Sequence, residues 1–391
     1  AGVSDGAPIR LAFTIISRRR WAGGYNYLRN LFAALNDHCP GAVTPVVFAG
    51  HRDDAADLDD LGRIGGVETV RAPAFDQDRV GVAGAFLLGQ DRAAVAEFRR
   101  HRIDAVFESA RFFGWRLPYP ALAWVPDLQH RQLPQLFPTA ARWRRELGFR
   151  AQFAAGRTIL LSSASAERDC LTFYPNAKGK TVVVRFATRP PAALLGRDPG
   201  EVIATYGLPA NYFYLPNQFY AHKNHGLVAI ALKILAGQGR EVVVAVSGSQ
   251  HDARGSEAFD AVMRMVRELG LETSFRYLGV IPIEHVYALL RSAVALINPS
   301  RFEGWSTTVE EAKAFGVPLV LSNIEVHREQ AGANALFFPV DDPAALATQL
   351  ASFSPSAPVV RDLLPVADEQ VKRFAHDFVA AVRRLINARR R

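Results

Sequence analysis

The residues best placed to do chemistry lie between positions 298 and 318. An apolar run ends at Ile297, a short loop carries Glu303 and Gly304, and a helix is predicted to open near Thr307. The start of a helix offers unpaired N–H groups and a partial positive charge, which together suit a phosphate. Because open parallel sheets bind ligands at the carboxyl ends of their strands, this stretch predicts a ligand site.

A local alternative explains part of the same stretch. Thr307 with Glu310, or Thr308 with Glu311, has the spacing of a capping box at a helix start. Such a box accounts for one carboxylate, but it does not account for Glu303 in the preceding loop. The ligand site is therefore the better interpretation.

The spacing of two glutamates in this stretch resembles a known family. Glu303 and Glu311 are separated by seven residues, in the setting SRFEGWSTTVEEAKAFGVP. This resembles the E-x(7)-E motif of retaining glycosyltransferases of family 4, which have the GT-B fold. The resemblance implies that Glu303 contacts the donor sugar and that Glu311 binds the ribose hydroxyls, since one carboxylate accepts two hydroxyl hydrogen bonds. It also assigns the residues between them to sugar and phosphate: Gly304, Trp305, Ser306 and Thr307.

A second segment, LPNQFYAHKNH at 215–225, follows the first predicted strand of the second half. By resemblance to the same family, Lys223 neutralises the donor diphosphate, and Asn217, Gln218 and Asn224 line the donor loop. The family usually has an Arg five residues before this Lys, where this chain has Gln218. We expect His222, His225 or an Arg of the first domain to supply the missing charge. A solvated Lys at a helix start is the alternative, because a phosphate-binding Lys is recognised only by its context.

A third segment, AWVPDLQHRQLPQLF at 123–137, places Asp127 and His130 just after a short predicted strand. It resembles the W-x-P-D-x-Q-H-x-x-x-P stretch of some family 4 sequences. The His would position the acceptor, and the Asp would orient that His or accept a proton. Strand-end loops favour functional residues, although a solvated turn remains an alternative.

Gly23 and Gly24 lie between the first predicted strand and the first predicted helix. Two glycines permit close approach of a phosphate to the backbone, and the resemblance places this loop near the donor diphosphate. A plain turn is the alternative. The loop is not a full G-x-G-x-x-G fingerprint, so NAD binding has poor support.

No metal site is expected. Two Asp-x-Asp triplets, at 57–59 and 76–78, lie in polar, loop-like sequence away from any predicted strand end. No His and Cys residues have zinc-site spacing. We therefore expect no cofactor and no metal requirement, with a nucleotide sugar as co-substrate.

The elements that must position these residues alternate along the chain, which predicts an α/β fold with parallel sheets. A helical face is formed by Leu28, Leu31, Phe32 and Leu35, and further helices are predicted at 93–101 and 139–155. The stretch 51–80 is predicted to be irregular. The predicted strands are 9–16, 43–48, 105–107, 121–125, 158–161 and 181–186, and then 212–215, 241–246, 275–278, 293–297, 318–321 and 336–339.

This order predicts two Rossmann-like domains facing a central cleft, the GT-B arrangement. We expect an acceptor domain at 1–187, a Pro- and Gly-containing linker at 188–200 and a donor domain at 201–370. The resemblance to GT-B enzymes implies that a terminal helix at 371–391 crosses back and packs on the first domain through Phe374, Phe378, Val382 and Leu385.

The composition is that of a globular protein, with 49% apolar and 21% charged residues and no apolar run of about 20 residues. Two cysteines give no disulfide framework, and the first residues show no signal pattern, so a cytoplasmic location is expected. The net charge of +8 and the Arg-rich stretches at 18–20, 142–145 and 389–391 indicate reversible binding to an anionic membrane surface. Charge that serves only solubility or donor attraction is the alternative. Nucleic acid is not an expected partner, because no recognition motif is present.

The resemblance implies a reaction that transfers a sugar from a nucleoside diphosphate to a hydroxyl of a saccharide or lipid-linked acceptor, and we prefer GDP-mannose as the donor. By resemblance the configuration is retained, and the products are bacterial polysaccharide or lipopolysaccharide. Three alternatives stay open: a GT-B-like nucleotide-sugar epimerase, an inactive sugar-nucleotide-binding protein, and a scaffold that binds lipid or polyanion.

Overall fold

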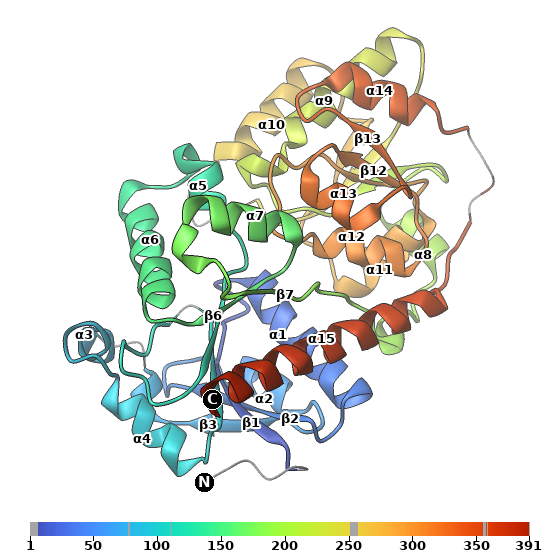
Figure 1. The fold of residues 1–391 in the computed structure, drawn as a ribbon. Coiled ribbons are helices and arrows are strands. Elements are labelled where there is room, and N and C mark those ends of the chain that lie inside the picture. Colours follow the sequence, from blue (N-terminus) through green and yellow to red (C-terminus); the bar gives the residue numbers. More distant parts are fainter. Residues whose placement is uncertain are drawn as a thin grey trace. The chain divides into compact units, whose positions relative to one another are not determined.

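A computed structural model of the chain describes residues 7–76, 79–109, 111–250, 257–354, 357 and 359–390. The chain divides into two compact units. Unit 1 comprises Ala1–Ala187 together with Glu369–Arg391, and unit 2 comprises Thr188–Asp368. Figure 1 shows that each unit consists of a sheet covered by helices. The terminal segment therefore groups with the first unit.

Unit 1 contains a parallel sheet in the order β3-β2-β1-β4-β5-β6-β7. Its strands are β1 (Ile9–Thr14), β2 (Val43–Ala49), β3 (Glu68–Arg71), β4 (Ala105–Glu108), β5 (Ala121–Trp124), β6 (Thr158–Leu161) and β7 (Thr181–Val183). The helices of this part of the chain are α1 (Ala22–His38), α2 (Ala55–Gly62), α3 (Arg79–Leu87), α4 (Arg92–Arg100), α5 (Gln129–Gln132), α6 (Thr139–Ala154) and α7 (Ala164–Phe173), with short 3-10 turns η1 (Pro73–Phe75), η2 (Pro134–Leu136) and η3 (Pro175–Ala177). The strand order reverses between β1 and β4, where a doubly wound sheet opens a crevice.

Unit 2 repeats this plan in the order β10-β9-β8-β11-β12-β13, again all parallel. Its strands are β8 (Phe213–Leu215), β9 (Val244–Val246), β10 (Phe275–Tyr277), β11 (Leu296–Asn298), β12 (Leu319–Ser322) and β13 (Ala335–Phe338). Its helices are α8 (Pro199–Thr205), α9 (His225–Gly237), α10 (Glu257–Glu268), α11 (Ile283–Ser292), α12 (Thr307–Ala314), α13 (Glu325–Ala331) and α14 (Pro343–Ala351), with 3-10 turns η4 (Ala192–Leu194) and η5 (Ala221–Lys223). The reversal here lies between β8 and β11.

Successive residues of the unit 2 strands enter two different cores. Ile297 and Val320 pack in the cluster that includes helices α9 and α14, whereas Leu296 and Leu319 pack in the cluster that includes α11 and α12. Since neighbouring residues of a strand point to opposite faces, both faces of this sheet are buried. Strands buried on both faces read as continuous apolar runs, which explains why the sequence revealed them.

The last helix, α15 (Pro365–Arg390), packs on unit 1 as predicted. Phe374 contacts Tyr27 and Phe186 edge to face, with ring centroids 5.9 Å and 5.6 Å apart. Phe378 lies 6.1 Å from the ring of Phe107, and Val382 and Leu385 are also buried. Residue 391 and the side chains at 389 and 390, included in the expected basic surface, lie outside the described residues.

The prediction of two doubly wound parallel sheets is confirmed, and several local predictions are corrected. The region 51–80 is not irregular, because it contains α2, β3, η1 and the start of α3. The expected linker at 188–200 already contains η4 and the first two residues of α8. The predicted strand at 293–297 begins only at Leu296. Among the described residues, no helix is long and apolar enough to cross a bilayer.

Candidate functional site

The reversal of strand order in unit 2 brings Lys223 and Glu303 together. Lys223 ends η5 after strand β8, and Glu303 lies in the loop after the adjacent strand β11. The Lys223 Nζ donates to Glu303 Oε1 at 2.6 Å, and the two side chains are 15% and 8% exposed. The pair therefore lies at the position where doubly wound sheets bind ligands.

Neighbouring polar side chains fix the Glu303 carboxylate. Ser300 Oγ donates to Glu303 Oε1 at 2.7 Å, and Asn298 Nδ2 donates to it at 3.3 Å. Asn298 also donates to Ser306 Oγ at 3.0 Å and accepts from Asn217 Nδ2 at 3.3 Å. This network connects the loops after β8 and β11 with the start of helix α12.

The charge on Glu303 is stabilised against its burial. Burial acts to raise the pKa of this carboxyl, but the positive charge of Lys223, the nearby His327 and His222, and the Lys223 hydrogen bond together lower the pKa to about 2. Glu303 is thus a carboxylate over the whole physiological range.

Glu311 lies in the opposite electrostatic setting. It is on helix α12, is 9% exposed, and accepts one hydrogen bond from Tyr287 Oη at 3.3 Å. Burial raises its pKa to about 7, and the bond from Tyr287 offsets this effect only in part. A buried carboxyl with so few donors has free acceptor positions for hydroxyl groups.

Neither of the two capping boxes that the sequence allows is formed. Ser306 is the N-cap of α12 and makes no side-chain capping bond. Glu310 instead accepts from Lys313 Nζ and Gln330 Nε2, each at 2.9 Å. Gln330 also binds the backbone of Ser306 through its N–H and its carbonyl, so it holds the helix start in place. The remaining predicted donor residues, Gly304, Trp305 and Thr307, are half-buried between Glu303 and Glu311.

Asn224 positions Lys223 through the backbone. It adopts the left-handed conformation with φ of 58°, which Asn tolerates better than most residues, and its Nδ2 donates to the Val340 carbonyl at 3.1 Å. Asn224 is 7% exposed and starts helix α9 immediately after Lys223. In this structure its side chain supports the turn.

His225 does not supply the charge that the Arg-to-Gln departure at Gln218 removes. Its ring stacks on Phe219 with centroids 4.1 Å apart, and its Nε2 contacts the Asn217 carbonyl at 3.3 Å. Burial first, and then the nearby Lys223 and His222, lower the pKa of His225 to about 3, so it is neutral. Gln218 itself is half-buried.

His327 is a site residue that the sequence reasoning missed. It is fully buried on helix α13, and its Nδ1 lies 2.9 Å from the Ser322 carbonyl, which accepts a hydrogen bond from it. Its Nε2 has no hydrogen-bond partner among the described residues, and its position affects the pKa of Glu303. Its place five residues after the end of strand β12 was the available signal.

In unit 1, the two glycines of the first loop lie inside the first turn of helix α1. A Cβ on Gly24 would lie 2.4 Å from the Trp21 ring, whereas one on Gly23 would lie 3.4 Å from it. Trp21 stacks on Trp124 with centroids 5.2 Å apart and remains 37% exposed. Gly24 is therefore needed for the packing of Trp21, whatever ligand lies nearby.

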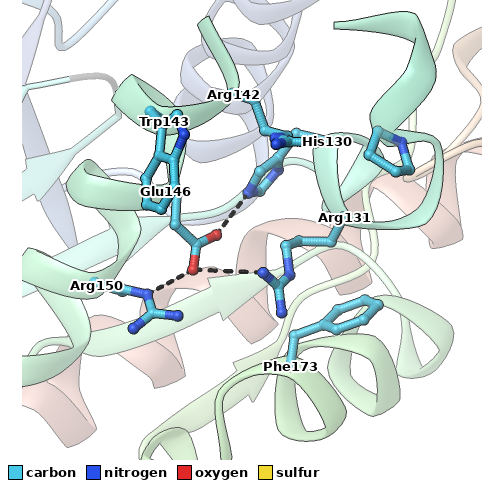
Figure 2. Close-up of a pocket in the computed structure, with 8 residues that line it drawn as sticks. His130, Arg131, Arg142, Trp143, Glu146, Arg150 and Phe173 are labelled. Atoms are coloured by element: carbon cyan, nitrogen blue, oxygen red, sulfur yellow. Dashed lines mark hydrogen bonds and ion pairs between the residues drawn. The ribbon is translucent and has the colours of Figure 1, made fainter. Parts of the chain in front are cut away.

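The unit 1 residues Asp127 and His130 hydrogen-bond different partners and not each other. Asp127 caps Gln129 N at 3.1 Å and pairs with Arg145 at 3.3 Å. His130 is fully buried, and its Nε2 lies 3.3 Å from Glu146 Oε2. The sequence had suggested Asp127 as the residue that orients His130. The carboxylate within hydrogen-bond distance of His130 is instead that of Glu146. His130 forms part of the wall of a pocket, shown in Figure 2.

The first Asp-x-Asp triplet is part of a structural cluster. Asp57 accepts from the backbone N–H of Arg18 at 2.9 Å, and the Arg18 side chain pairs with Asp60 at 2.9 Å. Of the second triplet, Gln77 and Asp78 lie outside the described residues. Within the described ranges, no group of three or more His, Cys, Asp or Glu side chains has the arrangement to hold a metal ion.

Part of the chain matches a known family of glycosyltransferases. Residues 208–361 match the family Glycosyl transferases group 1. The matched segment holds Lys223, Glu303 and Glu311, together with His327. Over 91 residues the chain is 31% identical to the O-antigen chain mannosyltransferase B of Escherichia coli, and this match spans 23% of the chain and 24% of that protein.

Solved structures share the whole architecture. A glycosyltransferase from Rickettsia africae superposes with a TM-score of 0.65 at 13% identity, over 98% of this chain and 97% of its own. The Anabaena protein HepE, determined in complex with UDP and glucose, gives 0.62 at 15% identity, over 96% and 94%. These likenesses show the fold, which is the GT-B fold that the sequence predicted.

Proposed function

We propose that this chain, which combines the GT-B fold with a group 1 glycosyltransferase domain over residues 208–361, transfers a sugar from a nucleoside diphosphate to an acceptor hydroxyl. The observation that carries the proposal is the buried pair of Lys223 and Glu303 at the strand-order reversal of unit 2. One group is a cation suited to a diphosphate, and the other is a carboxylate suited to sugar hydroxyls.

Lys223 acts on the leaving group. Charge builds on the diphosphate as the bond to the sugar breaks, and a preplaced ammonium is most effective at that stage. The N–H groups at the start of helix α12 have no partner within the helix and add a partial positive charge. Glu303 then accepts hydrogen bonds from the sugar while Ser300 and Asn298 hold its carboxylate.

Glu311 receives the ribose. Its free acceptor positions on a buried helix start suit two neighbouring hydroxyls, and the pKa of about 7 in the free protein would fall when such donors bind its ionised form. Nucleotide binding and proton release are therefore coupled at this residue.

His327 binds the donor sugar in this proposal and does not replace the charge absent at Gln218. Its fixed Nδ1 and unpartnered Nε2 place a hydrogen-bonding nitrogen near Glu303, where the diphosphate and sugar would meet. Burial lowers the pKa of His327, and its Nδ1 proton is directed at the Ser322 carbonyl, so Nε2 of the neutral ring accepts a hydrogen bond from a sugar hydroxyl and adds no second cation.

The finer assignments follow the relatives. We propose GDP-mannose as donor, since the Escherichia coli relative is a mannosyltransferase, and a saccharide or lipid-linked saccharide as acceptor. We also propose retention of configuration, with the departing phosphate taking the acceptor proton on the same face, and no requirement for a metal. The enzyme would act in the cytoplasm at the inner face of the membrane.

The test is a turnover assay with GDP-, UDP- and dTDP-sugars, with and without saccharide acceptors, in which nucleoside diphosphate release is followed and the product linkage is assigned by NMR. Acceptor-dependent release with a retained linkage supports the proposal. Conversion of the donor to its epimer without acceptor would instead establish an epimerase. Nucleotide binding without any turnover would establish an inactive sugar-nucleotide-binding protein, the alternative that Gln218 at the family's Arg position raises.

A further inference from the structure

Unit 1 holds a second charged site that the donor chemistry does not use. A cavity of about 340 Å³ lies between helices α5, α6 and α7. Figure 2 shows the guanidinium groups of Arg131 and Arg150 paired with the Glu146 carboxylate, and Arg142 on the same wall. The residues that line it are His130, Arg131, Pro134, Arg142, Trp143, Glu146, Arg150 and Phe173.

The carboxylate in this cavity is already saturated. Glu146 accepts from Tyr174 Oη at 2.6 Å and from Arg150 Nε at 2.6 Å, and it lies 3.3 Å from His130 Nε2 and 3.7 Å from Arg131. Burial acts to raise the pKa of Glu146, but the bonds from Tyr174 and Arg150 lower it below the ordinary value. Glu146 is therefore ionised, and its acceptor positions are occupied.

The positive charge of the cavity is not balanced. Burial lowers the pKa of His130, so its neutral ring adds no charge, and the lining residues carry three guanidinium groups and one carboxylate. Arg142 makes no ion pair or side-chain hydrogen bond with any described residue, and Arg150 uses only its Nε on Glu146. His130 is fully buried, and its Nδ1 also lacks a partner in the described part of the chain.

The cavity wall also has an apolar side. Trp143 is 64% exposed on helix α6, and Arg131 lies over the Phe173 ring at 4.9 Å, which fixes its guanidinium plane. Planar guanidinium groups bind phosphoryl oxygens in pairs, and exposed indole rings pack against the apolar face of a sugar or an acyl chain. The cavity lies shortly after strand β5, since only residues 125–128 separate Trp124 from helix α5.

We propose that this cavity binds a phosphoryl group carried by the acceptor. Arg142 and Arg150 hold the phosphoryl oxygens, Arg131 adds charge, and Trp143 covers the attached sugar or lipid. The identification of the ligand as the acceptor rests on the proposed function. The binding of a phosphoryl group in this cavity does not. The phosphoryl group belongs either to a soluble sugar phosphate or to a membrane lipid headgroup.

The first test measures binding of inorganic pyrophosphate by calorimetry in a Lys223→Met/Glu303→Gln background, which removes the cation of the unit 2 site together with the carboxylate that it neutralises. Arg142→Gln is expected to weaken binding by about tenfold or more, the effect of one charge-assisted hydrogen bond. Arg144→Gln is the matched control, because Arg144 is exposed on the same helix and does not line the cavity. Equal affinity in the two variants, or no binding at all, would overturn the proposal. Arg150→Gln gives an independent second variant.

The second test separates the two sources. A sugar 1-phosphate is titrated in solution, and vesicles of phosphatidylcholine with or without phosphatidic acid are used in flotation. Binding that depends on Arg142 in either arm supports the site and identifies its source, and binding that ignores Arg142 in both arms overturns it. GDP, UDP and dTDP are titrated into the Arg142→Gln protein, with Lys223 intact, in parallel. Failure of nucleotide binding there would count against the proposed function while leaving the phosphoryl site standing.

Discussion

Two buried carboxylates organise the two ligand-facing regions of this molecule, and they are surrounded differently. Glu303 in unit 2 faces one cation, Lys223, with the neutral donors Ser300 and Asn298 around it. Glu146 in unit 1 pairs with Arg131 and Arg150, and Arg142 lines the same cavity without an ion pair to any described residue. The unit 2 region is thus nearly neutral before a ligand arrives, whereas the unit 1 region carries surplus positive charge.

Because of this difference, the two regions would bind an anion in different ways. In unit 2, a diphosphate must share Lys223 with Glu303, so weakening of the existing ion pair offsets part of the binding free energy of the diphosphate. Lys223 therefore stabilises the diphosphate mainly as negative charge develops in the transition state. In unit 1, Arg142 has no pair to exchange, so an anion binds without displacing a partner. The first region is suited to catalysis and the second to holding a substrate.

The largest expected effect breaks the unit 2 pair. Lys223→Met should lower turnover at saturating donor by about 10²- to 10³-fold, because it removes a preplaced charge from the leaving group. It should also destabilise the fold by about 3–5 kcal/mol, because Glu303 is left buried without its cation.

The double variant Lys223→Met/Glu303→Gln is the control. It should recover most of the unfolding free energy in chemical denaturation and recover none of the turnover. Wild-type turnover in Lys223→Met would remove this residue from the active site.

The next effect concerns the second glutamate of the motif. The folded pKa of Glu311 is about 7, above its ordinary value of 4.5, so the folded state binds its proton more tightly than the unfolded state. The stability from this group is therefore complete below about pH 4.5 and is lost as the pH rises through 7. Glu311→Gln, which mimics the protonated form, should stabilise the protein by about 3 kcal/mol at pH 8 and change little at pH 4.5.

Urea unfolding of both proteins across this pH range is the measurement. If the difference in unfolding free energy between the two proteins does not grow from pH 4.5 to pH 8, the pKa of Glu311 is not raised in the folded protein.

A smaller effect sharpens the comparison from the unit 1 side. Glu146→Gln should tighten pyrophosphate binding several-fold, because the only anion of the cavity is removed, while the lost charge-assisted bonds cost about 1–3 kcal/mol of stability. Calorimetry and denaturation on the same preparation measure both effects. Weaker pyrophosphate binding in this variant would mean that Glu146 orients the arginines more than it competes with the anion.

Removal of divalent metal is expected to have no effect on turnover. Activity should persist in EDTA, because Asp57 is occupied by Arg18 and the described residues hold no metal-binding cluster. Loss of turnover in EDTA that manganese restores would contradict this expectation.

The sequence predicted most of the fold because its strands are buried on both faces and read as apolar runs. It failed at 51–80, where β3 is an edge strand with mostly exposed residues and the polar helix α2 is short. An edge strand carries little of the apolar pattern on which such predictions depend.

The candidate site was predictable where spacing along one segment carries it, as for Glu303 and Glu311. His327 and Gln330 were missed, because their roles depend on where helix α13 places them beside the loop after β11. The Glu146 contact with His130 spans 16 residues and two helices, so the sequence offered Asp127 as the nearer partner instead. Contacts between elements require the folded chain.

The central claim is that the Glu303–Glu311 segment binds a sugar nucleotide, and calorimetric titration tests it most directly. GDP, UDP and dTDP are titrated into the wild-type protein and into Glu311→Ala. The account predicts saturable one-to-one binding of at least one nucleotide by the wild type, weakened in Glu311→Ala by about 1.5–3 kcal/mol. Binding of none of the three, or equal affinity in both proteins, would contradict it.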